Sequence, residues 1–151
     1  MQNSPPSDAK LDERLQLIVT SYQRLTGKAL IDNAPADNIA LAVWNAPRAI
    51  VAHGTEEDPI FFYGNRLALR LFEMGFDEFA RLPSRLSAEP LAQEARVKLL
   101  EKVTQQGYVD GYSGKRIAKS GNRFMITDTT VWNLIDERGD HQGQAAVFVA
   151  Q

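Results

Sequence analysis

The side chains best suited to chemistry lie on one predicted strand, from Arg123 to Leu134. Alternate residues of a strand point to the same face. One face would then carry Phe124, Ile126, Asp128, Thr130, Trp132 and Leu134. A carboxylate buried in the middle of that face needs hydrogen-bond donors, because an unpaired buried charge is strongly destabilising. A polar ligand, water, Arg116 or a backbone amide would supply them, whereas a bulge would turn Asp128 outward.

Aromatic residues near this strand can either line a pocket or fill it. The indole of Trp132 can stack on a planar ligand such as a flavin or a nucleobase, although a tryptophan on a strand more often fills a core. The candidates for a ligand pocket are Tyr63, Phe72, Phe76, Arg116, Phe124, Ile126, Asp128, Thr130 and Trp132.

A second candidate site is the predicted loop from Leu82 to Glu89. Its residues Ser84, Arg85 and Ser87 can bind an anion, with the guanidinium as the main contact. The same residues can instead cap the following helix and carry surface charge. Both interpretations fit the sequence.

The remaining reactive residue types exclude several cofactors and reaction classes. His53 and His141 are the only histidines. Neither lies on a helix before the strands, where a haem ligand is expected, and neither has a partner at metal-ligand spacing. The chain has no cysteine, so disulfides, cysteine–zinc sites and a cysteinyl-flavin adduct are excluded. We predict no metal and no catalytic residue, while a non-covalent flavin or another small molecule remains possible as the cofactor.

The bulk composition gives expectations about location and partners. The formal net charge of −2 does not favour nucleic-acid binding. No apolar run approaches the roughly 20 residues that span a bilayer. Residues 1–10 are polar, carry Pro5 and Pro6 and lack the pattern of a signal peptide. We therefore expect a flexible N-terminus over 1–10, a cytoplasmic location, and neither a membrane nor a nucleic acid as partner.

Hydrophobic periodicity and turn residues predict the elements that position these side chains. Helices are expected over 9–26, 35–45, from a cap at Asn65, over 77–81, and from 90 to 106. Strands are expected over 49–53, 60–63, 108–118, 123–135 and 142–150. On the last helix the stripe of Leu91, Ala95, Leu99 and Val103 predicts that Arg96, Lys98, Glu101 and Lys102 face solvent. The order predicts an α+β fold with a five-stranded antiparallel sheet and helices on one face.

The first predicted helix is amphipathic. Its apolar stripe contains Leu11, Leu15, Ile18 and Tyr22. This stripe can cover the outer face of the sheet or meet the same stripe of a second copy. We predict that the stripes of two copies meet and that the protein is a homodimer.

Several strings of residues resemble known domains. Ile60–Asn65 followed by a helix and Gly75–Phe79 resembles the first half of a PAS domain, and Asn133–Gly139 resembles the hairpin before its last strand. Longer strings resemble the PAS-related MEKHLA domain: Asp58–Asn65, Leu82–Glu89, Gly111–Ile117, Val131–Leu134 and Gly143–Ala146. The resemblance covers about 11–148 and implies a single PAS-like domain over 11–151.

That resemblance implies a sensory or interaction role. The MEKHLA family occurs as free-standing bacterial and algal proteins and at the C-terminus of plant class III homeodomain-zipper transcription factors, whose DNA-binding segments are absent here. It has no established ligand. A sensor would hold a small molecule between the sheet and the helices of residues 65–106. A small cone-shaped α+β isomerase or dehydratase, with Asp128 as base, and an interaction module with an aromatic-filled centre are the alternatives.

Overall fold

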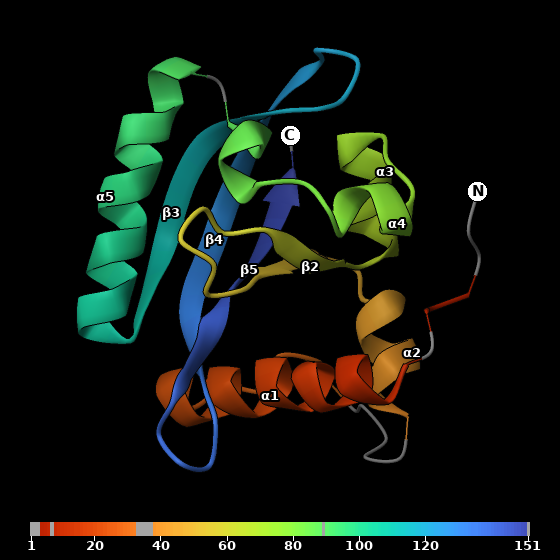
Figure 1. The fold of residues 1–151 in the computed structure, drawn as a ribbon, viewed down its shortest axis with the longest axis vertical. Helices are drawn as coiled ribbons and strands as arrows, with labels where there is room; N and C mark the ends of the chain where they lie inside the picture. The colour runs from red at the N-terminus through yellow and green to blue at the C-terminus, as the bar shows by residue number, and fades with distance from the viewer. Residues whose placement is uncertain (1–3, 7, 33–37, 89, 151) are drawn as a thin grey trace.

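The structure of the protein is a computed structural model that describes residues 4–6, 8–32, 38–88 and 90–150. Its helices are α1 (Ala9–Thr26), α2 (Ile39–Trp44), α3 (Arg66–Phe72), α4 (Phe76–Phe79), the 3-10 turn η1 (Ser84–Ser87) and α5 (Pro90–Gln106). Its strands are β1 (Ala49–His53), β2 (Phe61–Gly64), β3 (Tyr108–Ile117), β4 (Arg123–Ile135) and β5 (His141–Ala150). Figure 1 shows α5 running alongside β3, whereas α1 runs across the long strands near the turn between β4 and β5.

The five strands form one antiparallel sheet in the order β2-β1-β5-β4-β3. The C-terminal strand β5 therefore lies in the middle, between β1 and β4. The pairing of β1 with β5 joins the two β-rich parts of the chain into one sheet, and α3, α4, η1 and α5 form the connection between them along the sequence. The predicted α+β fold with five antiparallel strands is confirmed.

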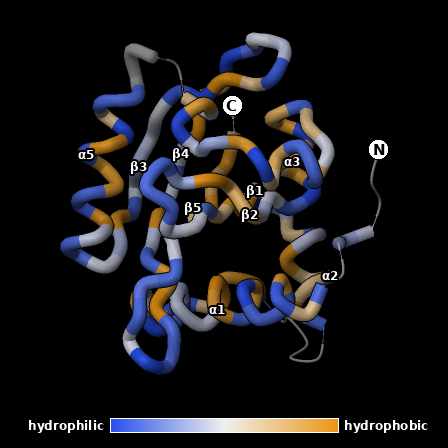
Figure 2. The backbone as a smooth tube through the Cα atoms, in the orientation of Figure 1, coloured by the Kyte–Doolittle hydropathy of each residue, from blue (hydrophilic) through white to orange (hydrophobic). Residues whose placement is uncertain are grey.

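Helix α1 covers the outer face of the sheet. The carboxylate of Asp8 accepts a hydrogen bond from the backbone N–H of Lys10 at 2.8 Å, and Gly27 ends the helix with a φ of +75°. Figure 2 shows the hydrophobic and hydrophilic positions alternating along the helix. The hydrophobic ones are buried against β4 and its neighbours: Leu11, Leu15, Ile18 and Tyr22. Their stripe thus packs on the sheet of its own chain.

Asn65 joins three elements through a fully used side chain. Its carbonyl oxygen accepts from the backbone N–H groups of Ile50 and Ala68, both at 3.1 Å. Its amide donates to the carbonyls of Val43 at 3.0 Å and Arg48 at 2.9 Å. The expected cap of α3 is confirmed, and the same side chain ties β1 and the end of α2 to it.

The element boundaries differ slightly from expectation. The predicted loop after Leu82 contains the turn η1, because the backbone N–H of Leu86 bonds the carbonyl of Pro83. Ala9 and Lys10 belong to α1 rather than to a flexible terminus. Residues 1–3 and 7, and the expected helix start at Pro35, lie outside the described residues.

The orientation expected for α5 is confirmed for Leu99, Val103, Lys98, Glu101 and Lys102 but was wrong for Ala95 and Arg96. Arg96 is buried, whereas Ala95 faces solvent. The reason is helical spacing: Arg96 precedes the buried Leu99 by three residues and Val103 by seven, so all three lie on one face. The side chain of Leu91, the first residue of the expected stripe, lies outside those described. α5 therefore presents a guanidinium, not an alanine methyl, to the sheet.

Candidate functional site

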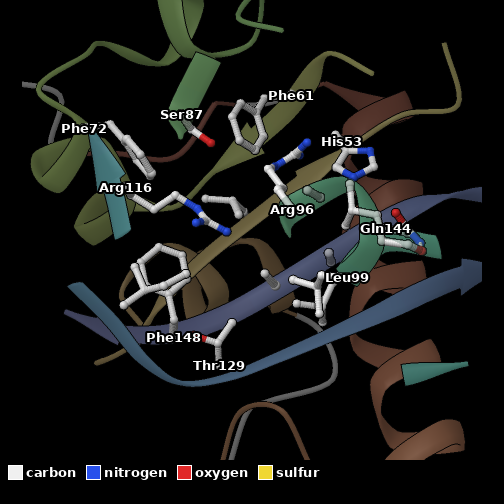
Figure 3. Close-up of a pocket in the computed structure, with 17 residues that line it drawn as sticks. His53, Phe61, Phe72, Ser87, Arg96, Leu99, Arg116, Thr129, Gln144 and Phe148 are labelled. Atoms are coloured by element: carbon white, nitrogen blue, oxygen red, sulfur yellow. Dashed lines mark hydrogen bonds between the residues drawn. The ribbon is translucent and has the colours of Figure 1, made fainter. Parts of the chain in front are cut away.

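A cavity of about 50 Å³ lies between the inner face of the sheet and α3, η1 and α5. Figure 3 shows its side chains converging from the strands and from these helices. Its polar lining consists of His53, Ser87, Arg96, Arg116, Thr129 and Gln144, and its apolar lining includes Val51, Phe61, Phe72, Ile126, Val131 and Phe148. Among the described residues the lining contains two arginines and no aspartate or glutamate.

The two arginines of the cavity are buried, with 7% and 8% of Arg96 and Arg116 exposed. The Nη2 of Arg96 donates to the hydroxyl of Ser84 at 2.6 Å, and the Nη1 of Arg116 donates to the carbonyl of Lys115 at 2.8 Å. No carboxylate of the described residues forms an ion pair with either. Burial, and then the positive charge of Arg116, lower the pKa of Arg96 to about 10, so it stays charged at neutral pH.

His53 completes the polar end of the cavity, at the end of β1. Its Nδ1 lies 3.0 Å from the carbonyl of Gly54, which can only accept, so Nδ1 carries the hydrogen and Nε2 presents a lone pair. That Nε2 is buried without a hydrogen-bond partner. Burial lowers the pKa of His53 to about 4; the Gly54 bond opposes this shift and the charge of Arg96 adds to it. His53 is therefore neutral at pH 7.

The backbone around His53 requires a glycine on the neighbouring strand. Gly143 has a φ of +137°, and a Cβ at this position would collide with the carbonyl oxygen of His53. Only glycine lets β5 pass so close to the end of β1. Gly143 thus helps to fix the position of the imidazole at the cavity wall.

The predicted anion loop contributes to the cavity through its serines. The Ser84 hydroxyl accepts from Arg96, and the Ser87 hydroxyl donates to the carbonyl of Ser84 at 2.7 Å. The Nε of Arg85 lies 3.2 Å from a carboxylate oxygen of Asp58, and this pair is half-exposed at the surface. The guanidinium of this region that points inward comes from α5, not from the loop itself.

A bulge in β4 changes which residues face the cavity. The register with β5 shifts between Thr127 and Thr130, and Asp128 adopts a φ of +48° with its side chain exposed. Beyond the bulge the faces are exchanged, so Thr129 and Val131 line the cavity. The single face expected from Phe124 to Leu134 is therefore wrong, because the extra residue interrupts the period of two.

Trp132 consequently lies on the outer face. Its ring meets that of Tyr22 edge-on at 4.8 Å, and its Nε1 donates to the carbonyl of Ile18 at 3.2 Å. The indole fills the core beneath α1 and does not reach the cavity.

The other pocket candidates are divided between the two faces. Phe72, Arg116 and Ile126 line the cavity, whereas Tyr63, Phe76, Phe124, Asp128, Thr130 and Trp132 do not. Tyr63 packs in the cluster beneath α1 and against Phe76, with ring centroids 5.9 Å apart. Burial raises the pKa of its hydroxyl, which has no hydrogen-bond partner. Phe124 packs edge-on against Phe72 at 5.1 Å, next to the cavity but outside its lining.

Sequence reasoning missed Arg96, Thr129 and Gln144, and it assigned His53 only a polar or capping role. The spacing of Arg96 from Leu99 and Val103 was a usable signal. No sequence signal marked the other three, because their exposure to the cavity depends on pairing and on the bulge.

No helix of the described part of the chain is both long and apolar enough to cross a membrane. No group of three or more histidine and carboxylate side chains within it is arranged to hold a metal ion.

Comparison with known proteins adds a family and a fold. The family model of the MEKHLA domain matches residues 12–151. The chain is similar to the PAS domain of a protein from Colwellia psychrerythraea, with a TM-score of 0.60 and 17% identity over 69% of this chain and 86% of that one. It is also similar to a light-oxygen-voltage domain studied with a flavin analogue, with a TM-score of 0.62 and 18% identity over 73% and 82% of the two chains.

A third similar structure is the light-state dimer of the fungal blue-light photoreceptor Vivid. Its TM-score is 0.62 at 13% identity, over 95% of this chain and 96% of that one. At these identities the likeness concerns the fold alone, and it confirms the expected PAS-like arrangement. No curated protein matches the sequence.

Proposed function

Because the chain belongs to the MEKHLA domain family, we propose that it is a PAS-like sensory module that binds a small molecule between the sheet and α3, η1 and α5. The observation that carries this proposal is the buried, unpartnered Nε2 of His53 at the wall of a cavity. Buried polar atoms nearly always have a hydrogen-bond partner. A ligand in the cavity supplies the missing one.

The size of the cavity restricts the ligand. Sites for drug-sized molecules and cofactors occupy about 300–1,000 Å³, whereas this cavity has about 50 Å³. A flavin does not fit without a large rearrangement. A ligand of a few non-hydrogen atoms fits the side chains as they stand.

The contacts of Arg96 provide a route from ligand to signal. This residue belongs to α5, lines the cavity and donates to Ser84 of the turn η1. A ligand that draws the guanidinium toward itself would weaken its hydrogen bond to the Ser84 hydroxyl. Occupancy would then change how η1 is held against α5, and this change is the signal that the module passes on.

A non-enzymatic role agrees with the position of Asp128. The isomerase-like alternative depended on this carboxylate as a base in an apolar pocket. It is exposed at the bulge instead. The sensory role therefore has the stronger support.

The expected partner is a second copy of the chain, in a cytoplasmic signalling pathway. The structure of Vivid is that of a dimer. In the present chain Leu11, Leu15, Ile18 and Tyr22 are buried under α1, so a homodimer would use other residues or would displace the helix. Measuring mass in solution over a range of concentrations checks this prediction, and a monomer at every concentration would contradict it.

Native mass spectrometry of the freshly purified protein tests ligand binding. We expect an added mass on wild type and its loss in Ala146→Leu, because the larger side chain projects into the cavity. Ala95→Leu is the matched control, since Ala95 lies on the solvent side of α5. An apo mass for wild type from cells grown under several conditions would speak against a bound ligand.

A further inference from the structure

We infer that the cavity takes a small carboxylate with a hydroxyl next to it, such as a short 2-hydroxy acid, held by Arg96 and Arg116 through its oxygens and by His53 through its hydroxyl. This inference rests on the proposed function, because it presumes that the cavity has a ligand. It adds the chemical class of that ligand.

The positive charge of the two arginines in the cavity favours an anionic ligand. Arg96 and Arg116 lose most of their contact with water, and the described lining has no acidic side chain. Asp58, which pairs with Arg85 outside the lining, favours the charged form of Arg96 less than burial and Arg116 disfavour it. The two cavity arginines are near enough to each other that the charge of one disfavours the charge of the other. Burying a charge without a counter-charge destabilises the folded protein. An oxyanion between the two groups removes this cost and provides the planar, two-oxygen acceptor that guanidinium groups bind best.

The unpartnered lone pair on Nε2 of His53 would be satisfied by a hydrogen-bond donor next to the anion. The amide of Gln144, on the strand paired with His53, is already committed, because it donates to Leu100, Thr104 and Asn133. No guanidinium N–H bonds Nε2 either. Arg96 and His53 line the same small cavity, and Figure 3 shows both side chains in its upper part. A hydroxyl on the carbon beside the carboxylate can donate to Nε2 while the carboxylate remains with the arginines.

The volume of the cavity and its apolar walls favour a short carboxylate over a fully polar oxyanion. One water needs roughly 10–15 Å³ by the same measure, so about 50 Å³ has room for a molecule of a few non-hydrogen atoms. Phenylalanine and valine side chains form much of the wall, among them Phe72, Phe148 and Val131. A short carbon skeleton suits these walls better than a fully polar ion such as phosphate.

Calorimetric titration of the full chain at constant ionic strength and pH 7.5 tests the inference with defined probes. Glycolate carries both the carboxylate and the hydroxyl, acetate lacks the hydroxyl, and acetamide lacks the charge. We expect glycolate to bind at least tenfold more tightly than acetate, and acetamide not to bind. In His53→Phe this preference of glycolate over acetate should disappear while both still bind.

Two arginine variants separate the cavity from general surface charge. Arg116→Met should weaken glycolate binding at least tenfold, whereas Arg81→Met, which removes an exposed arginine outside the cavity lining, should leave it unchanged. Circular dichroism shows whether each variant is folded. Equal loss in both variants, or acetamide binding as well as glycolate, would overturn the inference. Tighter binding of inorganic phosphate than of glycolate would overturn the choice of a carboxylate.

The native mass spectrum keeps this inference distinct from the proposed function. If wild type carries an added mass that corresponds to an uncharged molecule and does not bind glycolate, the inference is contradicted and the proposed function is supported. A protein without added mass that binds none of the probes contradicts both.

Discussion

The two faces of the sheet are built in opposite ways. Beneath α1 the face is filled: the rings of Trp132 and Tyr22 pack edge-on, and the indole N–H has a carbonyl partner. The opposite face has a cavity with Arg96, Arg116 and an unpartnered His53 nitrogen. The same strands thus support, on one side, a core packed with rings, in which the Tyr63 hydroxyl has no partner, and, on the other side, a cavity lined by two arginines.

This difference indicates which face carries stability and which carries function. Close packing gains free energy from every buried methylene group. Buried charges without counter-charges lose free energy in the absence of a ligand, and proteins keep such arrangements mainly at functional sites. Substitutions on the two faces should therefore change stability in opposite directions.

Trp132→Ala should have the largest effect. It removes the central side chain of the outer face, which is fully buried, and large-to-small changes of this kind cost about 3–5 kcal/mol. Urea unfolding followed by far-ultraviolet circular dichroism measures the loss. Trp132→Phe, which retains a ring, should lose less. A loss below about 1 kcal/mol for the alanine variant would show that the outer face is not the stabilising one.

Acidification should destabilise the protein through His53. Its pKa falls from 6.5 when unfolded to about 4 when folded. As the pH drops through this window, the unfolded chain takes up a proton that the folded chain refuses, so stability present above pH 6.5 is lost, by roughly 3 kcal/mol at pH 4. The charges of Arg96 and His141 act in the same direction, and Glu56 opposes them.

His53→Gln isolates this contribution of the cavity face. Between pH 7.5 and 4, the unfolding free energy of wild type should fall by roughly 3 kcal/mol more than that of the variant, which has no imidazole at this position. Parallel curves for the two proteins would mean that His53 is not the group responsible.

Arg116→Met should have a smaller effect with the opposite sign. It replaces one of two buried guanidiniums that lack a counter-charge, and the ligand-free protein should gain about 1 kcal/mol. Arg85→Met should change stability by less than about 0.5 kcal/mol, because its ion pair is half-exposed. Chemical denaturation without added ligand gives both values. A destabilised Arg116→Met would show that this charge is structural.

Among the substitutions expected to change stability, Asp128→Gly should have the smallest effect. The residue has a φ of +48° and an exposed side chain. Glycine adopts this conformation freely, so stability should rise by about 0.5 kcal/mol. Thermal unfolding measures the shift, and binding of glycolate should not change. Loss of binding would mean that Asp128 reaches the cavity after all.

Much of the architecture was predictable from local signals. The stripe from Leu11 to Tyr22 with Asp8 and Gly27 at its ends gave the limits of α1, and Asn65 marked the start of α3. The strings around Gly64 and Leu134 indicated the family over nearly the whole chain. These signals lie within a few residues of one another, and short-range sterics and hydrogen bonding are enough to interpret them.

The sequence by itself determined the elements, the family and the presence of the polar residues that now form the site. The tertiary structure decided which face of the sheet each of these side chains occupies. One extra residue at Asp128 reverses the alternation of β4, sending Trp132 to the outer core and Thr129 to the cavity. His53 and Arg96 are separated by 43 positions along the chain. They line one cavity because β1 pairs with β5 while α5 packs on β3 and β4 of the same sheet, and such long-range packing leaves no trace in the local pattern.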